Sequence, residues 1–212
     1  MTRPRPTRVP SRAPASASAP SVATAKMTEA EVSLRLAYWL LAEGLVEGLV
    51  EVAIDGAQVR TGTTTHFDLP AFLLQCGWVK DGDSTGWQCQ YRTMALNGRI
   101  RVHSNPGQGD VVARLRSGHL LRVECKKGPL KQSKGSPEYR LLREALGQLL
   151  TVAEVSERDI LAVAVPRSNK FDELAKRWRR APLVERFKIR ILTVDQSGAV
   201  SGLETEDQRA SQ

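Results

Sequence analysis

The feature that most restricts the fold is an unbroken apolar segment, Ile-Leu-Ala-Val-Ala-Val, at residues 160–165. Side chains alternate between the two faces of a strand, so a strand without polar residues must be covered on both faces. Amphipathic helical patterns flank this segment, one over residues 137–150 capped by Ser136 and one capped by Asn169. A buried strand between two such helices indicates an α/β protein with helices on both faces of its sheet.

A capping box marks the start of the first helix. Thr28 is followed three residues later by Glu31, and apolar residues then recur at helical spacing as far as Gly44, which favours a helix end. We expect residues 50–54 to form a short strand or to extend this helix. Residues 55–85 show no clear periodicity, apart from a short apolar cluster near their middle.

Further strands are expected at residues 87–96, 99–103, 110–116, 120–126 and 187–194. The first two flank Asn97-Gly98, a dipeptide typical of two-residue hairpin turns. The next two are joined around Ser117-Gly118-His119. The predicted order is therefore helix, three or four strands, helix, strand, helix, strand, with a mixed central sheet.

The net charge of +8 in 212 residues is distributed unevenly. Residues 1–26 carry five basic residues, no acid and five of the eleven prolines, so we expect a disordered tail rich in Pro, Ala and Ser. We expect a folded domain at residues 27–201, only mildly basic, and a flexible C-terminal tail at residues 202–212. Met27 could be the start of translation.

The composition excludes some classes of protein. No apolar run approaches the roughly eighteen residues of a membrane span, so we expect no membrane partner. Three cysteines fit a reducing compartment better than a disulfide scaffold. The Arg- and Ala-rich, Lys-poor usage suggests a bacterial source, and we expect a cytoplasmic protein. Cys76 and Cys89 lack the paired spacing of a zinc site, and the sequence holds no phosphate-binding glycine loop.

The chemistry is carried by the strand that ends in Glu124-Cys125-Lys126. Alternation places Glu124 and Lys126 on one face and Cys125 on the other. Among the 23 acids, only Glu124 has a lysine two positions later. If the hairpin turn centres near Gly118, Asp110 lies opposite Lys126 or within one residue of it, so two carboxylates and a lysine converge at one strand end.

Two close carboxylates repel each other unless a cation lies between them. Carboxylate oxygens with open water positions suit Mg²⁺, which also takes phosphate oxygens as ligands. Such an ion can lower the pKa of a bound water and stabilise charge on a phosphate, while Lys126 orients that water or helps to deprotonate it. These residues therefore predict metal-dependent hydrolysis of phosphodiesters.

The pattern Gly109-Asp110, thirteen residues, Glu124-Cys125-Lys126 resembles the PD-(D/E)xK, or restriction-endonuclease-like, nuclease superfamily. The resemblance covers residues 28–165 and implies an αβββαβ core, here with an additional C-terminal αβ unit. It implies that Asp110, Glu124 and the backbone carbonyl of Cys125 bind Mg²⁺, with Mn²⁺ as a substitute, and that Lys126 is the catalytic lysine. Gly109 departs from the proline of the family's pattern.

The resemblance also implies contributions from two helices. Members often add a glutamate from the first helix; Glu31 is our choice, ahead of Glu29 and Glu43, although its capping box is a sufficient structural explanation. Many members place a Gln or Lys on the helix after the motif, which makes Gln148 a candidate catalytic residue.

Nucleic acid, preferably DNA, is the expected partner. Lys126, Lys127, Lys131 and Lys134 lie within nine residues that include no acid, and clustered lysines bind phosphate backbones. Arg177, Arg179 and Arg180 form a second group, which favourable charge at a helix C-terminus also explains. A homodimer or a larger DNA-processing complex is compatible with this reading. The alternative is a non-catalytic nucleic-acid-binding or protein-interaction module that retains the same fold.

Overall fold

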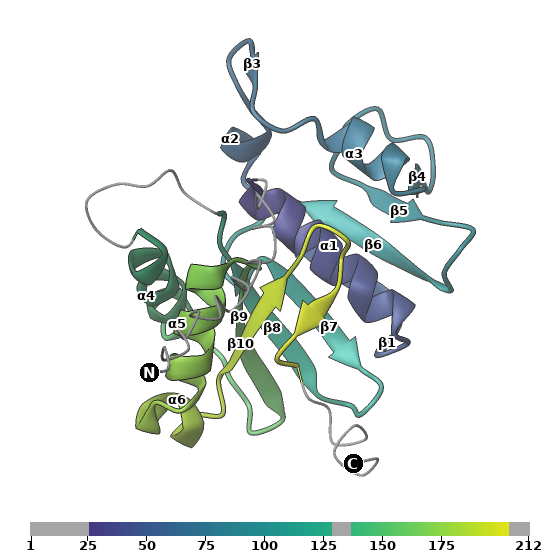
Figure 1. The fold of residues 1–212 in the computed structure, drawn as a ribbon. Coiled ribbons are helices and arrows are strands. Elements are labelled where there is room, and N and C mark those ends of the chain that lie inside the picture. The colour runs from purple at the N-terminus through teal and green to yellow at the C-terminus, as the bar shows by residue number, and fades with distance from the viewer. Residues whose placement is uncertain (1–25, 129–136, 204–212) are drawn as a thin grey trace, which may run out of the picture.

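A computed structural model describes residues 26–128 and 137–203 of the chain (Figure 1). Most of both predicted tails, Lys131, Lys134 and the predicted cap Ser136 lie outside these ranges. The helices are α1 (Glu29–Ala42), α2 (Gly56–Val59), α3 (Leu69–Gln75), α4 (Pro137–Leu149), α5 (Asn169–Arg179) and α6 (Pro182–Arg186). None of the helices within the described ranges is long and apolar enough to cross a membrane.

The strands are β1 (Val46–Ala53), β2 (Arg60–Thr61), β3 (Thr64–Thr65), β4 (Val79–Lys80), β5 (Gln90–Arg92), β6 (Gly98–His103), β7 (Val111–Leu115), β8 (Leu120–Cys125), β9 (Asp159–Pro166), β10 (Arg190–Val194) and β11 (Val200–Ser201). All except β2 and β3 form one mixed sheet in the order β11-β10-β9-β8-β7-β1-β6-β5-β4. At its centre β1, β7 and β8 are antiparallel neighbours, and β9 runs parallel to β8. The predicted α/β class with a mixed central sheet is confirmed.

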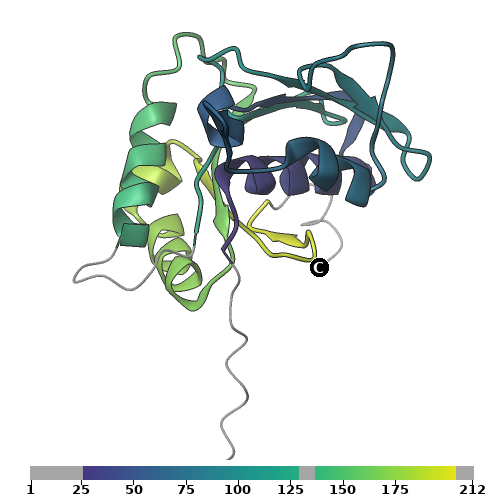
Figure 2. The ribbon, with the colours of Figure 1, turned by 90° about the horizontal axis from the view of Figure 1, so that it is seen from above.

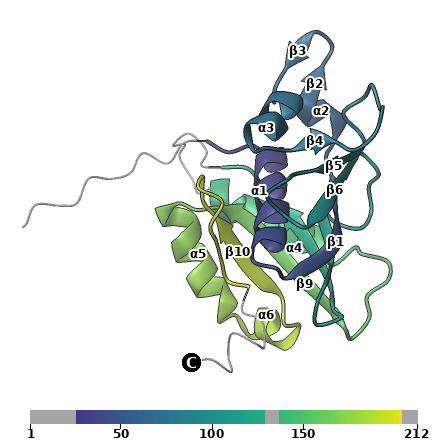
Figure 3. The same ribbon diagram turned by 90° about the vertical axis from the view of Figure 1, so that its right-hand side faces the viewer.

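Helices cover the two faces of the sheet unequally. Figure 2 shows α1 and α3 on one side of the sheet, and α4 and α5 on the other side at one end. The larger apolar core lies under α1, and a second core joins α4 and α5 to β9 and β10. In Figure 3, β1 and β6 lie at the opposite side of the molecule from α5. The two helical layers therefore overlap only in part.

The first helix begins as predicted, because Oγ1 of Thr28 accepts a hydrogen bond of 3.1 Å from the backbone N–H of Glu31. It ends before Gly44, whose φ of +63° is the left-handed conformation that glycine tolerates. Of the two alternatives for residues 50–54, the strand is correct: they belong to β1 and the turn after it. The segment 55–85, which showed no clear period, forms the short elements α2, β2, β3, α3 and β4.

The Asn97-Gly98 hairpin forms, but Gly98 is not in its turn. β5 pairs with β6 from Arg92 opposite Arg99, so residues 93–97 make the loop and Gly98 begins β6. A Cβ atom at Gly98 would lie 2.5 Å from Cδ2 of Leu41 and 3.2 Å from the carbonyl oxygen of Gly48. The glycine is therefore required by close packing of β6 against β1 and α1 rather than by turn geometry.

Two boundaries near the C-terminus also differ from prediction. Ser168, not Asn169, caps α5, since its hydroxyl accepts a hydrogen bond from the N–H of Phe171. The last predicted strand begins only at Arg190, because α6 and a left-handed residue, Lys188 with φ +54°, precede it. α6 and the short edge strand β11 were not predicted, since each is too short to show a period.

Candidate active site

The end of β8 buries three consecutive polar or reactive residues. Cys125 is fully buried in the core beneath α1, as the alternation of the strand predicts. On the other side of the strand, only 9% of Glu124 and 3% of Lys126 is exposed. An acid and a lysine are rarely buried this far without partners, so their surroundings decide what the site can do.

Asp110 lies beside this strand end at the start of β7. The predicted register is wrong, because the hairpin turns about Ser117 rather than Gly118, and the N–H of Asp110 donates to the carbonyl of Val123 at 2.8 Å. Its carboxylate nevertheless reaches further along β8, where Oδ2 accepts a hydrogen bond of 2.7 Å from the N–H of Cys125. Asp110 is thus held against the peptide that joins Glu124 to Cys125.

Gly109 makes this approach possible. Its φ is +104°, and a Cβ atom there would lie 3.1 Å from the carbonyl oxygen of Val123. A residue with a side chain would be strained by the backbone angle and crowded by the neighbouring strand. The glycine that departs from the family's pattern therefore has a local structural reason.

Lys126 is held between two acids from different helices. Its Nζ lies 3.6 Å from Oε1 of Glu29 on α1 and 3.6 Å from Oε1 of Glu144 on α4. The Glu29 side chain is 18% exposed, whereas that of Glu144 is 53% exposed. Glu29 is therefore the inner ion-pair partner of the lysine, and Glu144 contacts the same ammonium from the solvent side.

A backbone bridge brings α1 to the site. Met27 and Gly128 exchange two hydrogen bonds, from Met27 N to Gly128 O at 2.6 Å and from Gly128 N to Met27 O at 3.0 Å. Met27 stands two residues before Glu29, and Gly128 stands two residues after Lys126. The bridge therefore fixes the start of the helix beside the end of the strand and places the Glu29 carboxylate next to the lysine.

Two acids at the site, Asp110 and Glu124, have raised pKa values. Burial raises the pKa of Asp110 to about 7, with a further rise from the nearby Glu124 carboxylate, while the Cys125 N–H opposes the change. Burial also raises the pKa of Glu124, Lys126 lowers it in part, and Glu29 raises it. Like charges gathered in a buried place favour either proton uptake or a bound cation.

The acid of α1 that contacts Lys126 is Glu29, whereas Glu31, our choice from the sequence, pairs with Arg35. Glu31 accepts from Nε of Arg35 at 2.9 Å and forms an ion pair with the same guanidinium one helical turn away. Positions 29 and 31 differ by about 200° around a helix, so the two carboxylates point to different sides of α1. Glu31 thus has the structural role that its capping box indicated, since its N–H donates to Thr28 and its carboxylate accepts from Arg35.

The predicted residue Gln148 lies on α4, one turn beyond Glu144, and is exposed. The contact that the structure provides between α4 and the site is the ion pair of Glu144 with Lys126. Residues four apart share a helix face, so Gln148 lies on the same face of α4 as Glu144, one turn further along. Glu144 belongs to the segment that carries the resemblance, although no motif singled it out.

The predicted phosphate-binding lysines are only partly placed by the structure. Lys127 is exposed beside the site, and Lys131 and Lys134 lie outside the described residues. In the second basic group, the Arg179 guanidinium donates to the carbonyl of Ile191, and Arg177 lies over the ring of Tyr139. These two arginines have structural contacts within the α5 layer.

The donor set at the site suits a hard divalent cation. Across residues 26–128 and 137–203, no group of three or more His, Cys, Asp or Glu side chains is arranged to hold a metal ion. A cation here would rely on Asp110, Glu124 and the Cys125 carbonyl, with water and substrate oxygens as its other ligands. Mg²⁺ is usually bound in this way, through one or two carboxylates, so the residues present fit it.

Comparisons with known proteins add no assignment to this geometry. No protein-family model matches the chain, and neither a curated protein nor a solved structure matches it significantly.

Proposed function

We propose that the chain is a Mg²⁺-dependent nuclease of the PD-(D/E)xK superfamily that hydrolyses phosphodiester bonds, preferably in DNA. The observation that carries the proposal is the buried group at the end of β8. There Asp110 and Glu124 repel each other beside the buried Lys126. Two acids that repel each other can bind a cation and, through it, a phosphate. A hairpin with a purely structural role would have no reason to bury two acids side by side.

The order of elements supports the proposal. If residues 54–110 are treated as an insertion, the order α1, β1, β7, β8, α4 and β9 is compatible with the αβββαβ core that the resemblance implies. α5 and β10 would then correspond to the additional unit. The acids come from the hairpin β7–β8, as in the family's pattern.

Each residue at the site has a role in this reaction. Asp110 and Glu124 hold the cation, which when bound supplies positive charge that stabilises the developing charge on the phosphate. Lys126 donates to the attacking water and orients it toward the phosphorus. Glu29 and Glu144 position the Lys126 ammonium by their ion pairs. Lys127, exposed next to the site, attracts the substrate backbone.

The test is cleavage of labelled single-stranded, duplex and branched DNA, and of RNA, with Mg²⁺, Mn²⁺ or EDTA. We expect cleavage that requires the metal and that falls by at least about a hundredfold in Asp110→Asn and Lys126→Ala. Glu47→Gln is the control, because Glu47 is 70% exposed and lies away from the site. Cleavage in EDTA, or full activity of either site variant, would contradict the mechanism. Nucleic-acid binding without cleavage would favour the non-catalytic module.

A further inference from the structure

One half of the sheet has a face that no described helix covers. Along β6, Ile100 and Val102 are 1% exposed beneath α1, whereas the intervening arginines point to the opposite side. Figure 2 shows α1 and α3 on the first side of these strands, and α4 and α5 only over the far end of the second. The second face of β5, β6, β1 and β7 is therefore an open surface beside the site.

Three arginines dominate this surface, and we call them the arginine face. The side chains of Arg92, Arg99 and Arg101 are 50%, 57% and 44% exposed. Arg92 and Arg99 share one partner, Asp81, and Arg101 shares Glu51 with His103. Exposed ion pairs contribute at most about 1 kcal/mol, so these arginines can exchange their acids for phosphates at little cost.

The arginine face is continuous with the site. The N–H of Ala53 donates to the carbonyl of Asp110 at 2.8 Å, which fixes that end of β1 beside the proposed cation. From there β1 pairs with β6 so that Arg101 lies opposite Glu51 and Arg99 opposite Leu49. Four residues of strand span about 13 Å along β1, and Arg99 and Arg92 lie two and three strands to the side of Asp110, at about 4.8 Å a strand. The far arginines are therefore about 16 to 20 Å from Asp110, which equals about five to six base pairs of duplex at 3.4 Å each.

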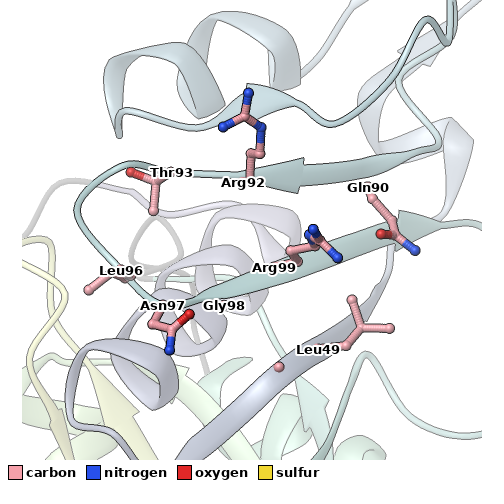
Figure 4. Close-up of a pocket in the computed structure, with 9 residues that line it drawn as sticks. Leu49, Gln90, Arg92, Thr93, Leu96, Asn97, Gly98 and Arg99 are labelled. Carbon is pink, nitrogen blue, oxygen red and sulfur yellow. The ribbon is translucent and has the colours of Figure 1, made fainter.

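A pocket of about 490 Å³ lies at the far end of this face. Figure 4 shows Arg92 and Arg99 on neighbouring strands of its wall, with Asn97 at the loop end. Gln90 and Asn97 add side-chain amides that can bond to phosphates or to base edges. The described residues of the face include no Trp, Tyr or Phe, the side chains that usually anchor protein partners.

We propose that the arginine face binds the phosphate backbone of the nucleic acid to one side of the scissile bond, with its far contacts about five to six base pairs away. This inference rests on the proposed nuclease function, because it takes the substrate at Asp110 and Glu124 as its starting point. A substrate must then extend over β1 and β6 to contact the arginine face. The nuclease would favour long substrates over short ones because of the charge of these arginines, whatever the base sequence of the substrate.

The first experiment measures binding in EDTA, so that it does not depend on cleavage. Labelled duplex DNA is titrated between about 50 and 200 mM salt with the wild type, with Arg92→Ala/Arg99→Ala/Arg101→Ala, and with a control, Arg60→Ala/Arg158→Ala/Arg186→Ala. The control removes the same charge from exposed positions elsewhere. Each lost phosphate contact lowers the slope of log Kobs against log salt by about 0.9. The slope should therefore be smaller by about 2 to 3 in Arg92→Ala/Arg99→Ala/Arg101→Ala than in wild type.

The inference is overturned if both triple variants change the slope equally, if neither changes it, or if the wild type binds no nucleic acid. Circular dichroism of each variant checks that its fold is intact. Unchanged slopes alongside metal-dependent cleavage would refute the arginine face while the proposed function stood. An arginine-dependent slope with no cleavage under any metal would refute the nuclease and leave a polyanion-binding face.

A second measurement uses cleavage by the protein with Mg²⁺. Wild type should cleave a long substrate faster than one trimmed to about two base pairs on either side of the scissile bond. The Arg92→Ala/Arg99→Ala/Arg101→Ala variant should cleave the long and the short substrate equally fast, at the rate at which wild type cleaves the short substrate. Retention of the length preference in this variant would contradict the inference.

Discussion

The N–H of Cys125 donates a hydrogen bond of 2.7 Å to Oδ2 of Asp110, which joins residues fifteen positions apart. This bond favours the ionised carboxylate, yet burial and Glu124 outweigh it and leave the pKa of Asp110 at about 7. The site is therefore organised to hold an acid close to the pH at which it loses its proton. Its behaviour should respond to both pH and divalent cations.

Asp110 should make the metal-free protein less stable as pH rises. Its pKa is about 7 in the folded chain, against about 3.9 for an unfolded aspartate. The proton bound in the folded state therefore stabilises fully below about pH 4, and this contribution is lost as pH rises through about 7. It amounts to about 4 kcal/mol at most.

Asp110→Asn keeps an oxygen for the Cys125 N–H and removes the titration. In EDTA we expect this variant to be more stable than wild type at pH 8 and nearly equal to it at pH 4. Urea unfolding at both pH values measures the difference. Equal pH profiles for the two proteins would contradict the prediction.

Mg²⁺ should stabilise the folded protein whether or not substrate is present. At a hundred times its dissociation constant, a ligand adds about 2.7 kcal/mol to the free energy of unfolding. We expect Mg²⁺ to raise the Tm of wild type and of Glu47→Gln, and to leave the Tm of Asp110→Asn and Glu124→Gln nearly unchanged. Differential scanning fluorimetry with and without EDTA is the measurement. An equal rise in all four proteins would place the cation elsewhere.

Glu29 and Glu31 offer a matched pair of substitutions on one helix. Glu29→Gln removes the inner ion-pair partner of the buried Lys126 and leaves the half-exposed Glu144 as its ion-pair partner, so we expect a loss of about 1 to 3 kcal/mol in unfolding free energy and slower cleavage. Glu31→Gln removes an i,i+4 pair with Arg35, a loss of about 0.5 kcal/mol, with cleavage unchanged. A larger loss of activity in Glu31→Gln would restore Glu31 to the site.

Gly98 and Gly147 form a second matched pair. Gly98→Ala forces a methyl group to within 2.5 Å of Leu41, which should cost about 1 to 3 kcal/mol. Gly147→Ala lies on α4 with nothing within 4 Å of the new methyl group, so it should stabilise by about 0.5 to 1 kcal/mol. Thermal unfolding of both variants tests this contrast. A Gly98→Ala protein as stable as wild type would show that β6 does not pack as described.

The sequence predicts the elements that have a clear period. The helix after Thr28, the strand at residues 160–165 and the helix at residues 137–150 are confirmed, because alternation and helical spacing record burial directly. The elements of residues 55–85 could not be assigned from the sequence, since they are two to seven residues long and are defined by contacts with the rest of the chain.

The site shows the same division between local pattern and tertiary contact. The spacing of Glu124 and Lys126 along one strand indicates a shared face, and both are buried together. The choice between Glu29 and Glu31 depends on the bridge from Met27 to Gly128, a contact across a hundred residues that leaves no local pattern. The selection of Glu144 over Gln148 likewise depends on how far α4 lies along β8.

The bridge between Met27 and Gly128 also ties the geometry of the site to the backbone just before α1. Lys26, exposed, comes directly before the bridge, and Lys127, also exposed, comes directly before Gly128. The two hydrogen bonds of the bridge hold Glu29 beside Lys126, so the spacing of that ion pair is set by main-chain contacts as well as by the two charges.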